Sequence, residues 1–311
     1  MSREKNINFL QINEKTFVDI PSSEPKIMLP IDKVGISNRP IVLNLTNPLS
    51  GNSQQMACEL RVSAGLPAGQ RGLHMSRIEE CLDEIRNQSL SPSEFCTELA
   101  KLNLKTQNQR NCLVELEAEL EHKVKKNTSG KSSIEIIKLH CSCEMLDESQ
   151  IITLGVSVPF MNACPCTQRW AIRDFYKLLL EKGCSENLSQ ELAQSAPLQA
   201  HTNGGLATLT IRDKNISHKD LYDVLDISVP IVREMLKGID EHSFVRFTHE
   251  QGQFCEDNVR SIAANTVSCL ENKLHDQASV CIEVEVNESV HFHNLRAEIK
   301  KTFAELRNSF I

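Results

Sequence analysis

Hydrophobic and polar residues alternate along several stretches of this chain, a pattern typical of strands with one buried face. The clearest stretch is Gln54–Gly65, in which apolar residues recur at every second position from Met56 to Val62. Turn-forming residues separate it from the preceding run. Similar runs occupy Arg39–Thr46, Cys112–Val124, Ser133–Leu146, Ile151–Met161, Gly205–Asp213 and Ala278–Ser289. We predict that each of them forms a strand.

Apolar residues at helical spacing predict helices between these strands. One such set runs from Met75 to Ile85, and Ser91–Glu94 then supplies a capping serine, a proline and a glutamate, which is a typical helix start. Later in the chain, Ser217–Gly238 and Gly252–Leu274 show the same spacing. We expect Pro230 to kink the first of these and Gly238 to end it.

The predicted order is strand, strand, helix, helix, strand, strand in residues 31–148, and it repeats in residues 149–311 around a polar helical insertion at about 168–197. This order predicts an α+β protein built from two tandem β-β-α-α-β-β units, each an antiparallel sheet with both helices on one face. Residues 1–30 are polar and interrupted by prolines, so we interpret them as an N-terminal arm. An α+β protein of two domains without internal symmetry fits the same pattern.

The composition, 40% hydrophobic and 24% charged, is that of an ordinary globular protein. No apolar run approaches the roughly 18 residues of a membrane span, and the charged N-terminus lacks a signal-peptide core, so we expect a cytoplasmic protein without a membrane partner. A net charge of −7 disfavours nucleic-acid binding but permits a small anionic substrate. The 12 cysteines contain no paired C-x-x-C motifs, which argues against a zinc ribbon.

Cys164 and Cys166 flank a single proline at the end of a predicted strand, and His201 lies in an H-T-N-G-G loop before the next strand. Thiolate and imidazole groups are favoured ligands of divalent metals. In an extended chain, side chains at positions i and i+2 point the same way, so both thiols are expected to line one pocket. Two core thiols and an exposed loop histidine are the alternative interpretation.

Carboxylates and histidines gather near the C-terminus. Glu288, His291 and His293 lie in E-S-V-H-F-H, where an extended chain would place both imidazoles on one side and favour ligand or acid–base functions. Glu256 begins a predicted helix, where the helix dipole favours an acid, and it also suits recognition of a guanine or pterin edge. Glu241 follows the expected helix end, where a solvated cap charge is the simpler interpretation.

The loop Gly69–Arg77 offers Arg71, His74 and Arg77 beside two glycines and a helix start. Backbone N–H groups and guanidinium groups in such a loop can hold phosphate oxygens, although the P-loop pattern is absent. A redox function of the C-x-C motif is weakly supported, because an extended chain lacks the helix-start setting that activates C-x-x-C thiols.

Five motifs in this order, GLPAGQRGLHMSR, NACPCTQ, GIDEH, FCEDNVRSI and ESVHFH, resemble GTP cyclohydrolase I of type IB, the prokaryotic form, from about Leu29 to the end of the chain. The resemblance implies tandem T-fold units and a homotetramer with active sites shared between subunits. It further implies one divalent metal per site (Zn, Mn or Fe). The implied reaction, the first step of folate or pterin biosynthesis, converts GTP and water to 7,8-dihydroneopterin triphosphate and formate.

Residue roles follow from the same resemblance. It implies that Cys164, His201 and Glu241 bind the metal, with Cys166 as a partner thiol, and that Glu256 anchors guanine. Glu288, His291 and His293 would be acid–base groups or further metal ligands. Arg71, His74 and Arg77 would bind the substrate.

The chain departs from the family pattern twice. First, 34 residues separate Cys166 from His201, where bacterial members have a short link. This insertion is more similar to the archaeal branch, whose product is a cyclic phosphate of dihydroneopterin and whose metal is ferrous iron. Second, Asn203-Gly204-Gly205 stands where the family usually has Gln-Arg. An archaeal-type cyclohydrolase and a non-catalytic purine- or pterin-binding paralogue are therefore the alternatives.

Overall fold

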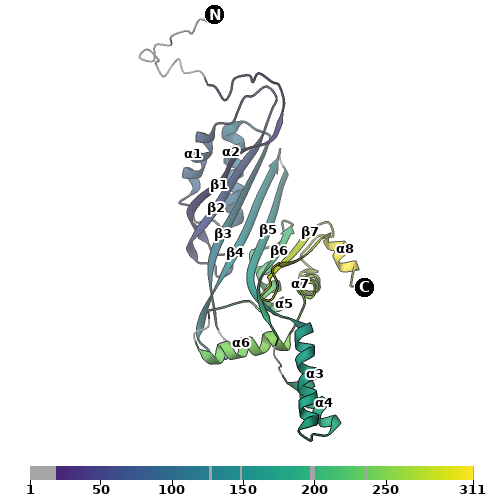
Figure 1. The fold of residues 1–311 in the computed structure, drawn as a ribbon. Helices are drawn as coiled ribbons and strands as arrows, with labels where there is room; N and C mark the ends of the chain where they lie inside the picture. The colour runs from purple at the N-terminus through teal and green to yellow at the C-terminus, as the bar shows by residue number, and fades with distance from the viewer. Residues whose placement is uncertain (1–18, 126–127, 148, 197–199, 235–236, 311) are drawn as a thin grey trace, which may run out of the picture.

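A computed structural model of the chain describes residues 19–125, 128–147, 149–196, 200–234 and 237–310. Its centre is one eight-stranded antiparallel sheet, in which each strand pairs with the next along the chain (Figure 1). The strands are β1 (Ile31–Thr46), β2 (Ser53–Leu66), β3 (Asn111–Lys125), β4 (Ser132–Leu146), β5 (Ser149–Ala163), β6 (Thr202–Arg212), β7 (Ser279–Asn287) and β8 (Leu295–Thr302). The α+β class is confirmed, but all strands join a single sheet instead of one sheet per unit.

Helices interrupt this succession of strands at three places. They are α1 (Met75–Ile85), α2 (Pro92–Gln107), α3 (Pro165–Glu181), α4 (Glu186–Ser195), α5 (His218–Ser228), α6 (Gly238–Glu250), α7 (Cys255–Leu270) and the C-terminal α8 (Phe303–Asn308). Helices α3 and α4 lie at the predicted insertion, whereas α6 and α8 were not predicted. The tandem β-β-α-α-β-β arrangement and its domain boundaries therefore remain a hypothesis.

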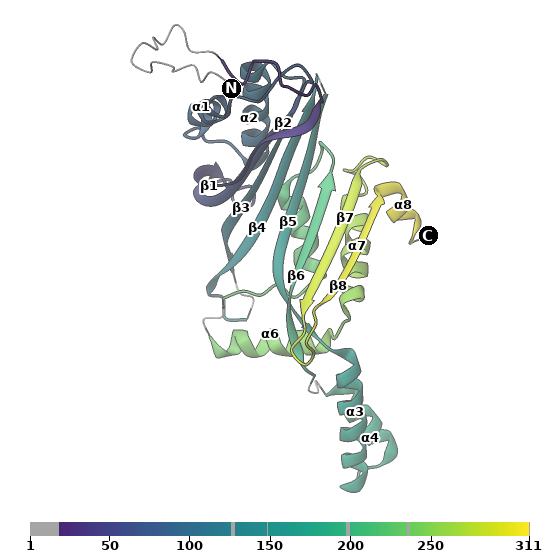
Figure 2. The same ribbon diagram turned by 45° about the horizontal axis from the view of Figure 1, so that its top comes forward.

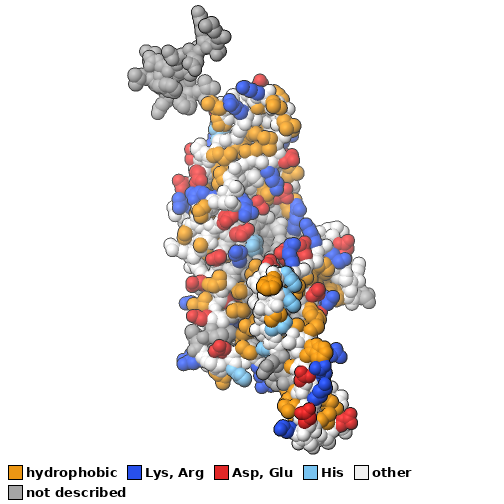
Figure 3. Space-filling view, viewed as in Figure 1, with side chains coloured by type: hydrophobic (Ala, Val, Ile, Leu, Met, Phe, Trp, Pro, Cys, Tyr) orange, Lys and Arg blue, Asp and Glu red, His pale blue; other side chains and the backbone are white. Residues whose placement is uncertain are grey.

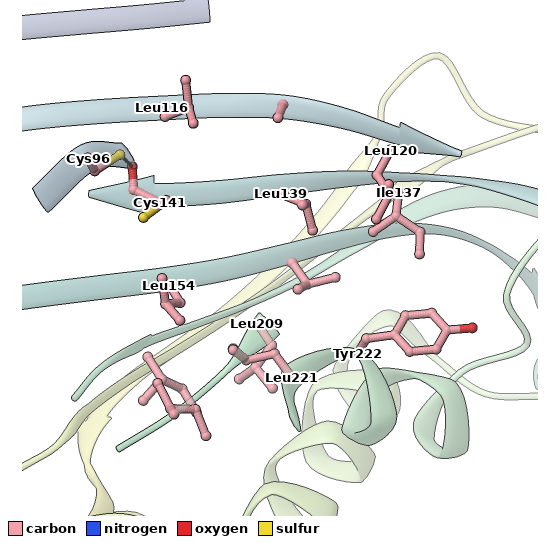
Figure 4. Packing of buried hydrophobic residues seen from close by; sticks show 14 of the residues in the cluster. Cys96, Leu116, Leu120, Ile137, Leu139, Cys141, Leu154, Leu209, Leu221 and Tyr222 are labelled. Carbon is pink, nitrogen blue, oxygen red and sulfur yellow. Dashed lines mark hydrogen bonds between the residues drawn. The ribbon is translucent and has the colours of Figure 1, made fainter. Parts of the chain in front are cut away.

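Apolar and polar side chains alternate along the strands, and the buried apolar ones form the core. In β3 the apolar residues from Val114 to Leu120 are buried at every second position, while the glutamates between them are more exposed. Buried residues of both halves of the chain belong to one continuous apolar cluster. Figure 4 shows part of it, with Leu116 and Leu154 from the sheet, Cys96 from α2 and Leu221 from α5. Each fully buried leucine contributes about 2 kcal/mol to this layer.

The segment before α6 corrects one prediction. Helix α5 ends at Ser228, and Gly238, predicted to end this helix, is the first residue of α6. The physical reason is Pro230, because the residue before a proline avoids helical backbone angles. Val229 is accordingly extended, with φ −137° and ψ 149°. Met235 and Leu236, whose spacing suggested a longer helix, lie outside the described residues.

Helices α3 and α4 form a hairpin that projects from one end of the sheet (Figure 2). No residue of α3 is buried, and α4 buries only Ser189 and Ala193, so the hairpin lies apart from the main core. Both ends of the hairpin return to the ends of β5 and β6. Within the described residues, none of the helices combines the length and the apolar character needed to cross a bilayer.

Candidate functional site

Strands β5 and β6 bring Cys164 and His201 together. The two strands pair continuously up to Ala163 and Thr202, so the next residue of each strand lies at the same edge of the sheet. There the Cys164 N–H donates to the carbonyl oxygen of His201 at 3.1 Å, and the His201 side chain is close enough to help lower the pKa of the Cys164 thiol. Both residues are half-buried. A thiol and an imidazole therefore face each other, as metal binding requires.

Cys166 lies elsewhere than expected. Cys164 is the N-cap of α3, and Pro165 is the first residue of that helix, where its fixed φ angle is favourable. Cys164 has the predicted extended backbone, but the prediction is wrong at Cys166, which is exposed in the first helical turn. The premise used against a redox function is also wrong, because the motif does begin a helix.

The environment of Cys164 favours its thiolate. Burial by itself would raise the pKa of this thiol, but hydrogen bonds from Thr167 and from the Cys166 N–H, together with the nearby His201 side chain, outweigh that effect, so its pKa is lowered. Deeply placed cysteines show the opposite behaviour, since burial raises the pKa of Cys58 to about 12. Cys164 is thus suited to binding a cation as a thiolate.

Asn203 connects this pair to Glu288. Its Nδ2 donates to Glu288 Oε1 at 2.7 Å, and its Oδ1 accepts from the Ser289 N–H at 3.0 Å. The same Oδ1 lies 3.3 Å from His201 Nδ1, and Ser289 Oγ lies 3.4 Å from that nitrogen. A chain of hydrogen bonds therefore runs from the candidate metal ligand to the candidate acid–base group.

The second carboxylate oxygen of Glu288, Oε2, is buried and has no hydrogen-bond partner. Leaving such an oxygen unpaired is costly unless a proton or a cation satisfies it. Together with Cys164 and His201 it provides sulfur, nitrogen and oxygen donors, which fit a zinc-like divalent ion. Nevertheless, within the described part of the chain, no group of three or more His, Cys, Asp or Glu side chains is arranged to hold a metal ion.

His291 and His293 lie in the loop between β7 and β8, not in a strand as expected. Their rings are stacked, with centroids 5.3 Å apart and an interplanar angle of 14°. Both are exposed, and Phe292 between them is fully exposed. Figure 3 shows histidine side chains grouped beside hydrophobic ones on the viewed face, above the α3–α4 hairpin. These imidazoles therefore share a side, but they stand in a loop open to solvent.

Glu241 and Glu256 occupy the first turns of α6 and α7, and both are exposed. The far end of α6 adjoins the candidate site, since His249 Nε2 lies 3.3 Å from the Ala200 carbonyl oxygen. Eight residues of helix place Glu241 about 12 Å from that end. The metal role of Glu241 remains a prediction, as does guanine recognition by Glu256, although the helix start expected at Glu256 is present.

Arg71, His74 and Arg77 precede or begin α1, at the opposite end of the sheet from α3 (Figure 1). Other segments of the chain already bind one polar group of each residue. The Arg71 N–H donates to the Ser23 carbonyl oxygen, His74 Nε2 lies 3.3 Å from Asp19 Oδ1, and Arg77 donates to the Thr106 carbonyl oxygen. Within one chain, therefore, this loop does not lie beside Cys164.

Three polar residues of the site were not predicted from the sequence. They are Thr167, Asn203 and Ser289. Only Asn203 had a sequence signal, because its segment was recognised as a departure from a family pattern, but that departure was interpreted as a loss. Short polar residues near turns are too common to stand out by themselves.

Known proteins resemble this chain in sequence over most of its length. A family model described as type I GTP cyclohydrolase folE2 matches residues 17–297. The chain is 27% identical to GTP cyclohydrolase MptA 1 of Methanocella arvoryzae over 304 residues, covering 94% of this chain and 96% of the relative. It is also 27% identical to GTP cyclohydrolase MptA of Haloferax volcanii over 300 residues, covering 93% and 97%.

Solved structures similar to this one include two uricases. The uricase from Arthrobacter globiformis aligns with a TM-score of 0.48 and 7% identity, covering 89% of this chain and 96% of that chain. A uricase from Bacillus fastidious aligns with a TM-score of 0.49 and 7% identity, covering 90% and 96%.

Proposed function

The chain belongs to the type I GTP cyclohydrolase family, and on this premise we propose that it is a metal-dependent enzyme that converts GTP and water to 7,8-dihydroneopterin triphosphate and formate. The observation that carries the proposal is the contact between Cys164 and His201, which the hydrogen-bond chain through Asn203 extends to Glu288. Family membership supports GTP as the substrate, and the site supplies groups suited to hydrolysis at a purine carbon.

The thiolate of Cys164 and the imidazole of His201 would hold one divalent ion, either Zn, Mn or Fe. The third ligand is Glu241, as the resemblance implies, or Glu288, whose Oε2 is buried without a partner. When bound, a metal of this kind supplies Lewis acidity and lowers the pKa of water to about 7.

The chain's own residues supply binding and proton transfer. The exposed carboxylate of Glu256 is free to accept two parallel N–H bonds from guanine and so to hold the base in register. His291 and His293 are placed on one side of a loop next to Glu288, where an imidazole can move a proton as the purine ring opens and formate leaves. Cys166, exposed at the start of α3, is a second candidate for proton transfer.

We further propose a homotetramer in which two chains complete each site. Two observations support it. The loop with Phe292, His291 and His293 is exposed in the single chain, and the substrate-binding candidates Arg71, His74 and Arg77 lie at the other end of the sheet. A neighbouring chain would bring such a loop beside Cys164. Light scattering should then give about four times the 35.0 kDa mass of one chain.

The test is turnover of GTP by protein purified without air and loaded with Zn, Mn or Fe(II). We expect formate release, pterin fluorescence and a product whose mass separates the linear triphosphate from a cyclic phosphate. The cyclic phosphate would assign the chain to the archaeal-type reaction, which the helical insertion α3–α4 favours. Cys164→Ala and His201→Ala should abolish metal binding and turnover.

Cys269→Ala is the matched control, because Cys269 is an exposed cysteine near the end of α7 and should be dispensable. Turnover like that of the wild type in the Cys164 or His201 variant would refute the proposed site. Tight GTP binding without formate would instead indicate a non-catalytic purine- or pterin-binding paralogue, which the Asn203-Gly204-Gly205 segment favours.

A further inference from the structure

We propose that Asn203 is a positioning residue of the active site, which orients the ring of His201 and the carboxylate of Glu288 at the same time. The inference rests on the proposed function and extends it to a residue that touches neither metal nor substrate. Asn203 is only 5% exposed, so water cannot readily replace the hydrogen bonds of its amide. Its orientation is therefore set by the protein groups around it.

Two partners fix the amide in one orientation. Oε1 of Glu288 is a carboxylate oxygen that accepts, so the group 2.7 Å from it must be Nδ2. The Ser289 N–H can only donate, so the group 3.0 Å from it must be Oδ1. A flipped amide would place an oxygen against the carboxylate and an NH₂ group against the N–H, which loses both hydrogen bonds.

The fixed amide determines the tautomer of His201. Since Oδ1 is an acceptor and lies 3.3 Å from His201 Nδ1, the neutral ring carries its hydrogen on Nδ1. In this tautomer Nε2 carries the lone pair that can bind a cation. Histidine ligands typically donate their other ring N–H to an oxygen in this way, and the hydrogen bond raises ligand basicity and fixes ring orientation.

The same amide holds Glu288. Because Nδ2 binds Oε1, Glu288 stays in one rotamer and keeps Oε2 buried without a partner. The position of Asn203 explains why its side chain can contact Glu288. Backbone pairing between β6 and β7 ends at Gly204 and Asn287, and one residue beyond it the side chain of Asn203 bridges to Glu288. Asn203 thus continues the link between the two strands where the backbone ladder ends.

The experiment compares three variants by their affinity for Co(II), measured in competition with a chelator. Asn203→Leu removes the hydrogen bonds of the amide to His201, Glu288 and Ser289 and should weaken binding by about 10- to 100-fold. Asn203→Asp keeps an acceptor for His201 but places a carboxylate against Glu288. It should retain the metal while kcat falls at least about 10-fold, with little change in KM for GTP.

Asn103→Leu is the matched control, because Asn103 in α2 is also buried, 2% exposed, and donates its Nδ2 to the Leu99 carbonyl oxygen. Its metal affinity should equal that of the wild type. Wild-type affinity in Asn203→Leu would overturn the inference, and so would an equal loss in Asn103→Leu, which would show a general effect of losing a buried amide.

A second measurement requires no metal. Long-range ¹H–¹⁵N spectra of the metal-free protein at about pH 8.5 report which nitrogen of His201 carries the hydrogen, with His201→Ala used for assignment. We expect Nδ1–H in the wild type and a mixture of tautomers in Asn203→Leu. Nε2–H in the wild type would overturn the inference. Absence of Co(II) binding by the wild type would refute the proposed metal site, and the tautomer would still decide the role of Asn203.

Discussion

Cys164 and His201 are joined by a main-chain hydrogen bond of 3.1 Å, and the His201 side chain helps to lower the pKa of the Cys164 thiol, although two helices separate them in the sequence. The pairing of β5 with β6 produces this contact, because the two residues follow the last paired positions of each strand. The paired ends of β5 and β6 therefore form the candidate site, and its geometry depends on how closely these two strands approach each other.

Gly205 permits that approach. A Cβ atom at this position would lie 2.5 Å from a ring carbon of Phe160 and 2.7 Å from the Glu285 carbonyl oxygen, whereas a Cβ at Gly204 would meet nothing within 4 Å. We expect Gly205→Ala to lower the free energy of unfolding by about 1–3 kcal/mol and Gly204→Ala to cost about 1 kcal/mol or less. Urea denaturation measures both, and equal stability of the two variants would contradict this account.

The hydrogen bond from Thr167 to Cys164 predicts a shift in thiol reactivity. Burial opposes the thiolate, and Thr167 contributes the leading hydrogen bonds that lower the pKa of Cys164. Because a lower pKa gives more thiolate at a given pH, Thr167→Val should move the iodoacetamide reaction of Cys164 to higher pH. Peptide mass spectrometry of metal-free protein follows this reaction. The exposed Cys269 should react identically in both proteins, and an unchanged profile at Cys164 would exclude a role for Thr167.

His218 predicts acid sensitivity of the fold. It is 2% exposed, and its Nε2 donates to the His140 carbonyl oxygen at 2.9 Å. Burial lowers the pKa of His218 from 6.5 to about 4. Below pH 6.5 the unfolded chain therefore binds a proton at His218 that the folded chain does not bind. The contribution of neutral His218 to the free energy of unfolding is complete above pH 6.5 and is lost as pH falls towards 4.

The measurement compares unfolding free energies of the wild type and His218→Gln, which retains a donor for His140. Between pH 7.5 and 5.5 the wild type should lose about 1.4 kcal/mol more than the variant. His242→Gln, a change at an exposed histidine, should behave as the wild type. Parallel pH dependence in all three proteins would show that His218 does not titrate in this way.

Arg233 predicts a stability effect in the segment that leads to α6. It donates to the fully buried carboxylate of Glu135 at 3.0 Å, and Tyr222 Oη donates to the same carboxylate. Arg233→Met would leave a buried charge without its cation, so we expect a loss of about 3 kcal/mol in unfolding free energy. Arg86→Met, which breaks an exposed pair with Asp83, should cost about 0.5 kcal/mol or less in the same denaturation experiment.

Much of the sheet could be predicted because strand alternation is a local signal. The runs around Met56 and Val114 have the burial pattern that their spacing indicated. Helix α6 could not be predicted in the same way, since its buried residues are only Asp240 and Thr248 and it shows no apolar stripe. Tertiary contacts position this helix, including the hydrogen bond from the Ser129 N–H to Asp240 Oδ1.

The residues of the candidate site could likewise be predicted only in part. Cys164 and His201 were identified from residue type, because sulfur and imidazole groups near strand ends are uncommon. Asn203 and Ser289 were not, since their function depends on a contact between residues 86 positions apart. Glu241 shows a further limit, because a resemblance assigns it to the metal while a single chain places it in the first turn of α6, at the end away from the candidate site.

The main-chain contact at the base of the α3–α4 hairpin has a consequence for how this region can vary. Where the two ends of a loop already touch, the length of chain between them is almost unconstrained, since closing a longer loop adds little entropic cost. Natural variation or protein engineering can therefore shorten, extend or exchange this appendage while the residues at its root keep their places.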